Sequence, residues 1–266
     1  MTQSDADRPK SSVSDGGLVG GFRRLGRGLL SWAMVPVFPL APLLPSRAQR
    51  LDDPARERDG LTLVLNGIQG TSLLERQIVL GLADAGLAGR IEIVDWTTGN
   101  PLRLIEHLRR RRRAADEAHA IVDRIIAYRR DWPDAPVNVV GYSGGGYLAL
   151  LVLEALPPGL RVTRAVLLAP SCSGRLDVVP LAQRTECGLY HFRSRFDVLV
   201  LGLLTIVAGT MDGWHETSAG FSGFDVEMER DTASGTTATH PSAADRFWSV
   251  PYRLRWWKSF HYVIGQ

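Results

Sequence analysis

The sequence predicts an α/β fold, a three-layer sandwich in which helices cover both faces of a mainly parallel sheet. From residue 61 onward, short apolar runs alternate with longer stretches in which apolar residues recur at helical spacing. Strands that alternate with helices form βαβ units with right-handed crossovers, and hence parallel sheets. Largely apolar runs such as 137–142 are typical of strands that are covered on both faces. The length of 266 residues suits one such domain with a short extension.

The expected strands are short and apolar, and turn-forming residues follow them. They lie at 61–66, 90–96, 137–142, 162–170 and 187–194. The expected helices lie between them, at 73–87, 105–132 and 144–156. Beyond residue 198 an apolar stretch fits either a helix or a buried strand. Residues 216–244 are rich in Ser, Thr, Gly and Asp, which predicts a long loop or lid.

The first 50 residues are expected to form a flexible tail and an apolar arm, with the α/β domain spanning 51–266. Residues 1–21 have a composition typical of disorder. In 22–45 a basic lead precedes an uncharged apolar run, a pattern that fits an arm packed on the domain, a membrane-surface anchor or a cleaved signal. Four prolines in that run argue against a membrane-spanning helix, because each removes a backbone donor.

Composition limits the partners. The net charge of +3 is too small to favour nucleic acid as the main partner. Cys172 and Cys187 are too few for a disulfide framework, and we expect two buried thiols, with a single disulfide between them as the alternative. No metal-ligand spacing is present, so we expect neither a metal nor a cofactor.

Five arginines at 109–113 predict a solvated helix surface, or a contact with anionic lipid. We expect a cytoplasmic or membrane-associated protein rather than a secreted one, and the oligomeric state stays open.

The segment Gly141-Tyr142-Ser143-Gly144-Gly145 matches the pattern G-x-S-x-G between an expected strand and an expected helix. This is the context of a nucleophile elbow, where small neighbours allow a strained turn to lift the serine hydroxyl away from the sheet. Free N–H groups at the helix start would favour developing negative charge. The alternative is a glycine-rich turn with an incidental serine. Phosphate-loop patterns fail here, because no lysine follows and Ser143 replaces a required glycine.

At these residues the chain resembles the α/β-hydrolase family, over roughly residues 60–200. It resembles in particular a bacterial subgroup of that family without a characterised activity. The phrases that carry the resemblance are LNGIQG at 65–70, IEIVDWTTGNP at 91–101, GYSGGG at 141–146 and GTMDGWHETSAGFSGF at 209–224. The resemblance implies a catalytic serine followed along the chain by an acid and then a histidine.

For the base, the resemblance favours His261, the only histidine in the C-terminal stretch. His215 is the first alternative, because loop-forming residues flank it, and His240 is the next. His191 alternates within an expected strand and fits a packed core histidine better. A base is required because a serine hydroxyl is a weak nucleophile at neutral pH.

For the acid, the resemblance favours Asp197, which follows the expected fifth strand. The same residue could instead cap a helix. Asp177, after the fourth strand, is the alternative, and Asp212 ranks third. The oxyanion would be held by the backbone N–H groups of Gly144 and Ile68, unless residues 66–70 form a plain Asn-Gly turn.

Gln69 and Tyr142, beside these two donors, are expected to bind substrate. The resemblance therefore implies a serine hydrolase that cleaves an ester-type carbonyl, lipid acyl esters included, through an acyl-enzyme. A small-molecule or lipid ester is the expected substrate because the segments around the serine are apolar. Two alternatives stay open: a non-catalytic binding or membrane-associated protein of the same fold, and an acyltransferase with the same triad.

Overall fold

The structure is a computed structural model that describes residues 47–68, 70–71, 73–97, 111–193, 210–212, 218–225 and 246–251. Its strands are β1 (Leu61–Leu65), β2 (Arg90–Val94), β3 (Val137–Tyr142), β4 (Arg164–Leu168), β5 (Leu189–Arg193) and β6 (Phe247–Pro251). Its α-helices are α2 (Leu73–Asp84), α4 (Arg111–Asp131), α5 (Gly144–Ala155), α6 (Val179–Ala182) and α8 (Ala219–Ser222). Two 3-10 helices, η3 (Arg47–Leu51) and η4 (Pro54–Asp59), precede β1.

The described strands form one sheet in the order β2-β1-β3-β4-β5-β6, with every neighbouring pair parallel. Every residue of β1 and β3 is buried, as expected of central strands covered on both faces. Because the strands are parallel, all their carboxyl ends meet at one edge of the sheet and all their amino ends at the other. Below, these are called the carboxyl edge and the amino edge.

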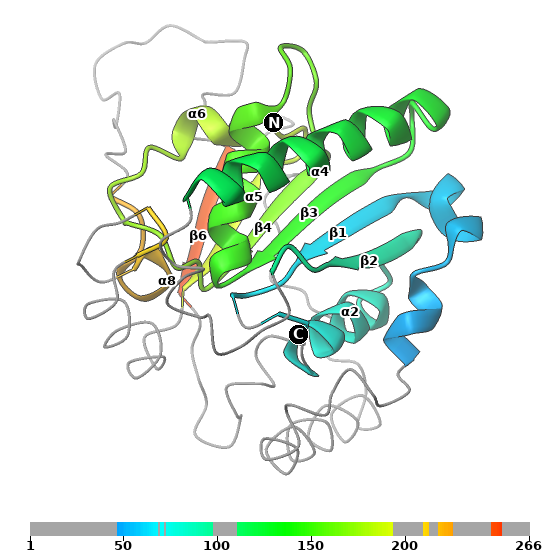
Figure 1. The fold of residues 1–266 in the computed structure, drawn as a ribbon, viewed down its shortest axis with the longest axis horizontal. Helices are drawn as coiled ribbons and strands as arrows, with labels where there is room; N and C mark the ends of the chain where they lie inside the picture. The colour runs from blue at the N-terminus through cyan, green and yellow to red at the C-terminus, as the bar shows by residue number, and fades with distance from the viewer. Residues whose placement is uncertain are drawn as a thin grey trace, which may run out of the picture.

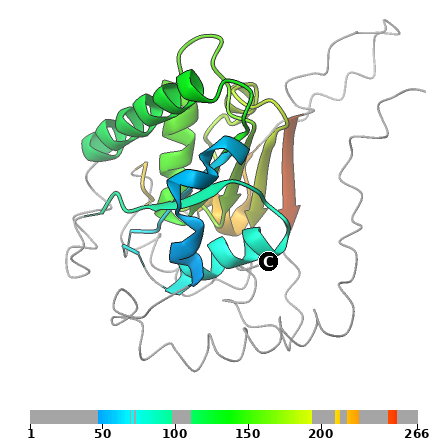
Figure 2. The same cartoon turned by 90° about the vertical axis from the view of Figure 1, so that its right-hand side faces the viewer.

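Helices cover both faces of the sheet. The views in Figures 1 and 2 place α4 and α5 together on one face and α2 on the other. Alternation along β1 supplies both cores: Leu63 and Leu65 pack in the core that contains α4 and α5, whereas Val64 packs with Ile78 and Val79 of α2. This is the three-layer, mainly parallel architecture predicted from the sequence, and the prediction is confirmed.

The expected elements differ from the observed ones mainly at their ends. The five predicted strands all form, but β4 is shorter than the predicted 162–170. Strand β6 was not predicted. It pairs with β5 at the sheet edge, where the ring of Trp248 stacks on Tyr190 at 4.8 Å between centroids. Pro251 is tolerated at the end of this edge strand because it need not donate to a further strand.

One prediction about the cysteines is wrong. Both thiols are free, but only Cys172 is buried, whereas Cys187 is exposed in the turn before β5. That turn contains Gly188 at φ 121°, which directs the chain into β5 and leaves Cys187 at the surface.

Several expectations fall outside the described residues, including the apolar arm at 22–45 and the parts 216–217 and 226–244 of the expected lid. No helix within the described ranges is long and apolar enough to cross a membrane.

A network of charges lies at the amino end of β2. The Arg90 guanidinium, with its side chain 16% exposed, contacts the carboxylates of Asp52 and Glu57 at 2.6 Å and that of Glu92 at 3.4 Å. Arg124 of α4 also bonds Glu92 at 2.5 Å. These contacts attach η4 and α4 to the edge of the sheet.

Candidate functional site at the carboxyl edge

The turn between β3 and α5 places Ser143 in a strained conformation. Ser143 has φ 52° and ψ −116°, and it lies between the last residue of β3 and the first residue of α5. Such a backbone costs a non-glycine residue roughly 1–3 kcal/mol and persists only where its surroundings hold it. Among the described residues, only Ala169, at the end of the adjacent strand β4, is another non-glycine with positive φ.

The glycines around Ser143 are required by close packing. A Cβ added to Gly141 would overlap the carbonyl oxygen of Gly145, and a Cβ on Gly145 would overlap that of Leu65. A Cβ on Gly146 would lie 2.7 Å from Cβ of Pro170. The glycines therefore let α5 start directly against the ends of β1, β3 and β4, which fixes the turn that carries Ser143.

Backbone hydrogen bonds hold Ser143 from both sides. Its N–H donates to the carbonyl of Leu168 at 3.0 Å, and its carbonyl accepts from Gly146 at 2.9 Å and from Ser171 at 3.1 Å. The residue is 9% exposed, and its hydroxyl makes no hydrogen bond to any other residue in the described ranges. The hydroxyl is thus uncommitted within the part of the chain that the structure describes.

Ile68 and Gly144, the predicted oxyanion donors, are neighbours in the fold. The position of a Cβ on Gly144 lies 3.5 Å from the backbone nitrogen of Ile68 and 2.6 Å from its Cγ2. Both residues are buried, and the N–H group of neither donates to a described acceptor. The structure thus brings two uncommitted N–H groups close to Ser143, from the β1–α2 loop and from the start of α5.

Two buried side chains fix the loop that carries Ile68. The indole Nε1 of Trp96 donates to the carbonyl of Asn66 at 2.8 Å. The carboxylate of Glu75, fully buried in α2, accepts from the N–H of Gly67 at 3.3 Å. Trp96 also lies 3.3 Å from the position of a Cβ on Gly144, so it packs against both sides of the candidate site.

A second carboxylate, Asp95, holds the far end of the same loop. It accepts hydrogen bonds from the N–H and hydroxyl of Thr71 at 3.1 and 3.0 Å. It also accepts hydrogen bonds from the N–H and the hydroxyl of Thr97, at 3.0 and 2.7 Å. Burial acts against ionisation of Asp95, but the hydrogen bonds from Thr97 and Thr71 outweigh it and lower the pKa of Asp95 below its ordinary value. Asp95 therefore remains an anion that ties β2 to the β1–α2 loop.

The described parts of 209–224 pack beside Ser143. Met211 donates its N–H to Ser171 at 2.9 Å, and Ala219 donates to Cys172 at 2.7 Å. Both oxygens of the buried Asp212 carboxylate accept from the N–H of Ser173 at 3.0 Å. These bonds hold two distant stretches of chain against the loop that follows β4, at the carboxyl edge.

The remaining predicted site residues divide into those that the structure describes and those that it does not. Asp197, His261, His215, His240 and Gln69 lie outside the described residues. Asp177 is exposed and accepts from the N–H of Val179 at 3.2 Å, a local contact at the start of α6. Tyr142 is 6% exposed and packs in the core on the α2 face. Its role in substrate binding stays a prediction.

His191 is a core residue, as its alternation within the strand predicted. It is fully buried on β5, its ring lies 4.8 Å from that of Phe224, and Nδ1 lies 3.1 Å from the hydroxyl of Ser249. Burial, and secondarily the charge of Arg193, lower the pKa of His191 to about 4. The only other histidine in the described ranges, His119, is exposed on α4. Neither bonds to Ser143.

Sequence reasoning missed Glu75. It placed Asp95 and Trp96 at the end of the second strand, where the pair could shape the mouth of the site, but it did not predict their contacts. Glu75 carries a detectable signal, because a carboxylate within an otherwise apolar helical stretch must have a specific partner if it is buried. Asp95 and Trp96 lie at the end of the predicted strand 90–96. In the sheet this strand is the neighbour of β1, which precedes the loop that carries Ile68. The contacts of the pair to Asn66 and Thr71 cross about 25–30 residues of chain, so no local pattern predicts them.

Solved structures with a weak similarity to this chain include two that are described as alpha/beta hydrolases. No family model matches the chain, and no curated protein is significantly similar in sequence. A protein of the alpha/beta superfamily of hydrolases from Xanthomonas campestris pv. campestris has 16% identity and a TM-score of 0.35, over 51% of this chain and 71% of its own. The alpha/beta hydrolase enzyme MGS-M1, from a Medee basin deep-sea metagenome library, has 20% identity and a TM-score of 0.33, over 58% of this chain and 64% of its own. Neither similarity is strong enough to identify a family or a reaction.

Proposed function

We propose that the protein is a serine hydrolase that cleaves an ester-type carbonyl substrate through an acyl-enzyme on Ser143. One observation carries the proposal: a non-glycine residue is held at φ 52° between a buried parallel strand and a helix, among glycines whose close packing keeps it there. Strain of this kind is typical of functional sites. A serine in a strained strand–helix turn is also the arrangement that a nucleophile elbow requires.

The sheet topology supports Asp197 as the acid and His261 as the base. The chain leaves β5 at Arg193 and β6 at Pro251, both at the carboxyl edge that carries Ser143. Asp197 follows Arg193 by four residues, and His261 follows Pro251 by ten. The order of serine, acid and histidine along the chain is the order found in α/β-hydrolases.

The proposed oxyanion hole consists of the N–H groups of Ile68 and Gly144. Both are close together, buried and uncommitted to described acceptors. The positive end of the dipole of α5, a helix of 12 residues, adds to the stabilisation of negative charge near Ser143. Each N–H donor in such a hole contributes roughly 3 kcal/mol to transition-state stabilisation.

The proposed reaction has two steps and uses these residues in the following roles. The Ser143 oxygen attacks the carbonyl carbon while His261, oriented by Asp197, takes its proton. The carbonyl oxygen becomes an oxyanion between the N–H groups of Ile68 and Gly144. The carbon–oxygen bond to the alcohol breaks, and His261 returns the proton to the departing alcohol. Water, deprotonated by His261, then attacks the acyl carbon and releases the acid, and Ser143 regains its proton.

Labelling with a fluorophosphonate tests the nucleophile. We expect the wild type to be labelled and Ser143→Ala to remain unlabelled at equal fold stability. Ser171→Ala is the matched control: this serine follows the neighbouring strand β4, is buried, and its hydroxyl has no hydrogen-bond partner among the described residues. Loss of labelling in both variants, or labelling of Ser143→Ala, contradicts the proposal.

Labelling and product analysis together distinguish a hydrolase from the two alternatives, a non-catalytic binding protein and an acyltransferase. A folded wild-type protein that is never labelled would favour a non-catalytic binding protein. A labelled protein that converts an ester to a second ester when an alcohol is added, and releases little free acid, would be an acyltransferase. A hydrolase releases the acid at nearly the same rate with and without added alcohol.

A further inference from the structure

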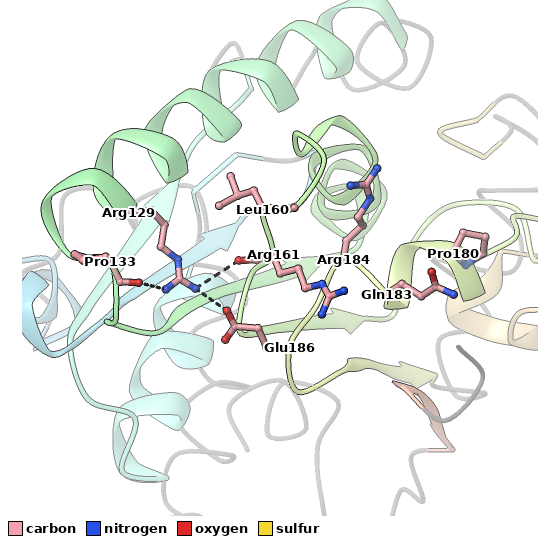
Figure 3. Close-up of a pocket in the computed structure, with 9 residues that line it drawn as sticks. Arg129, Pro133, Leu160, Arg161, Pro180, Gln183, Arg184 and Glu186 are labelled. Carbon is pink, nitrogen blue, oxygen red and sulfur yellow. Dashed lines mark hydrogen bonds and ion pairs between the residues drawn. The ribbon is translucent and has the colours of Figure 1, made fainter. Parts of the chain in front are cut away.

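We propose that a basic cleft at the amino edge of the sheet binds a small molecule that bears a phosphate group. The cleft has a volume of about 780 Å³, within the range of small-molecule sites. Its walls come from the end of α4, from α6 and from the segments that lead into β4 and β5. It is therefore at the opposite edge of the sheet from Ser143. Figure 3 shows its labelled side chains.

Arg129 is the structural centre of the cleft. Its side chain is only 14% exposed. Its guanidinium donates to the carbonyls of Pro133 at 2.8 Å, Ala135 at 3.0 Å and Arg161 at 3.4 Å, and it pairs with Glu186 at 3.1 Å. The dashed lines in Figure 3 all meet at this residue. Arg129 is thus fully used in joining the cleft walls.

The two segments that carry Arg161 and Arg184 are held side by side by backbone bonds. Val162, next to Arg161, donates its N–H to the carbonyl of Arg184 at 3.1 Å. Glu186 donates in turn to the carbonyl of Val162 at 2.9 Å. Arg246, at the start of β6, donates to the carbonyl of Thr185 at 2.7 Å. The backbones of Arg161 and Arg184 therefore have a fixed spacing before any ligand arrives.

The guanidinium groups of Arg161 and Arg184 have no hydrogen bond or ion pair with any residue in the described ranges. Among the described residues that line the cleft, only Glu186 carries a carboxylate, and it is already paired with Arg129. Two unpaired cations thus remain on a fixed frame. A cleft wall focuses their field and attracts anions.

Phosphate fits this arrangement best. A guanidinium binds phosphate oxygens through two parallel N–H donors, and a doubly charged phosphate can use two guanidiniums at once. The volume exceeds that of a bare phosphate, so an organic portion of the ligand would occupy the rest. We infer a free phosphorylated small molecule, although a lipid headgroup offers the same chemistry.

Calorimetric titration of the full chain with inorganic pyrophosphate at low ionic strength tests the site. We expect saturable binding by the wild type, and at least tenfold weaker binding by the double variant Arg161→Ala, Arg184→Ala. The matched control is Arg130→Ala, Arg164→Ala, which removes the same two charges from exposed positions that do not line the cleft. We expect this control to bind within about twofold of the wild type.

Two further variants sharpen the test. Glu186→Gln removes the cleft's carboxylate and should tighten pyrophosphate binding severalfold. Ser143→Ala should leave the affinity unchanged, which separates this site from the proposed reaction. Absence of saturable binding by the wild type, or an equal loss in the control double variant, overturns the proposal.

A second arm distinguishes the two sources of phosphate. Co-sedimentation with phosphatidylglycerol vesicles, against phosphatidylcholine vesicles, should show no difference between the wild type and the Arg161, Arg184 double variant if the ligand is a free small molecule. Vesicle binding that requires both arginines and that pyrophosphate displaces would overturn the small-molecule assignment in favour of a lipid headgroup.

Discussion

The two edges of the sheet are held by different kinds of interaction. At the carboxyl edge, glycines bring backbone against backbone, and both positive-φ residues other than glycine in the described ranges, Ser143 and Ala169, lie there. At the amino edge, arginines and carboxylates join the elements, through Arg90 at β2 and Arg129 at the cleft. Close backbone packing also occurs at the amino edge, at Gly89, and carboxylates also hold loops at the carboxyl edge. The described ion pairs that join separate elements, however, lie towards the amino edge.

This difference separates two possible tasks. A strained turn fixed by close packing can present one hydroxyl in one geometry, as covalent chemistry requires. An edge rich in guanidiniums can bind an anion without strain, because the cations need only a fixed spacing and an open cleft. Substitutions at each edge, and in the strand between them, test whether the two edges differ in this way.

Gly145→Ala should be the most damaging change. Its Cβ would overlap the carbonyl oxygens of Leu65 and Asn66, which are backbone atoms and cannot rotate away. We expect a loss of about 3 kcal/mol in the free energy of unfolding, measured by urea denaturation. Gly159→Ala, at the amino edge, is the matched control. Its Cβ meets nothing within 4 Å, so only its φ of +86° costs energy, about 1 kcal/mol. Equal losses would remove the proposed contrast.

His191, on β5 between the two edges, should make stability fall in acid. Its folded pKa of about 4 lies below the ordinary 6.5, so between these pH values the unfolded chain binds a proton that the folded protein does not. The free energy of unfolding should therefore drop by roughly 3 kcal/mol from pH 7 to pH 4 through this residue alone. Above pH 7 the contribution is constant.

Denaturation curves of His191→Gln across that pH range check the effect. In this variant the free energy of unfolding should lose most of the pH dependence that His191 causes. His119→Gln, which alters an exposed histidine on α4, should retain it. If the free energy of unfolding of His191→Gln fell with pH as steeply as that of the wild type, another group would be responsible for the loss of stability in acid.

Arg90→Met should show that the amino edge depends on charge. The change leaves the carboxylates of Asp52, Glu57 and Glu92 without their shared cation. Because these partners are partly exposed, the expected loss is only about 1–2 kcal/mol at low ionic strength. The loss should shrink in 1 M salt, where the Debye length is about 3 Å.

The control for this change is Arg58→Met, which removes a 72% exposed side chain and should cost little at any salt concentration. The loss in Gly145→Ala should not depend on salt. A salt-dependent loss at Gly145, or a salt-independent loss at Arg90, would contradict the distinction between the edges.

Ala169→Gly should have the smallest effect, and it should be stabilising. Glycine removes the strain of the positive φ of 47° at the end of β4, but it also adds conformational entropy to the unfolded chain. Because the first effect is larger, we expect the free energy of unfolding to rise by roughly 0.5 kcal/mol. Ala165→Gly, on the same strand with ordinary φ, should instead lose about 1 kcal/mol. Thermal unfolding of the two variants should therefore shift in opposite directions.

The sequence predicts the layers and most strands because these depend on local periodicity. Runs such as 61–65 and 137–142 are mostly apolar, with Thr62 and Asn138 as polar exceptions, and a buried parallel strand needs little else. Strand β6 is different: Phe247–Pro251 has an exposed edge and a terminal proline, so its formation depends on pairing with Tyr190 and its neighbours on β5. Pairing of this kind depends on contacts between distant segments, so the sequence of β6 shows no periodic pattern that would predict it.

The candidate site follows the same division. The strained position of Ser143 could be predicted, because glycines on both sides of a serine between a strand and a helix have one steric explanation. The approach of Ile68 to Gly144 was predictable only through the family resemblance. The contacts of Trp96 and Glu75 that fix the Ile68 loop join residues from three elements, and no single segment encodes them.

The central claim is that an acyl group is transferred to Ser143. The most direct measurement is to mix the protein with a p-nitrophenyl ester, stop the reaction in acid within milliseconds to seconds, and determine the mass of the protein and of its peptides. We expect one added acyl mass, located on the peptide that contains Ser143 and absent from Ser143→Ala. An active protein that carries the acyl group on another residue, or hydrolyses the ester at the same rate in Ser143→Ala, would contradict this claim.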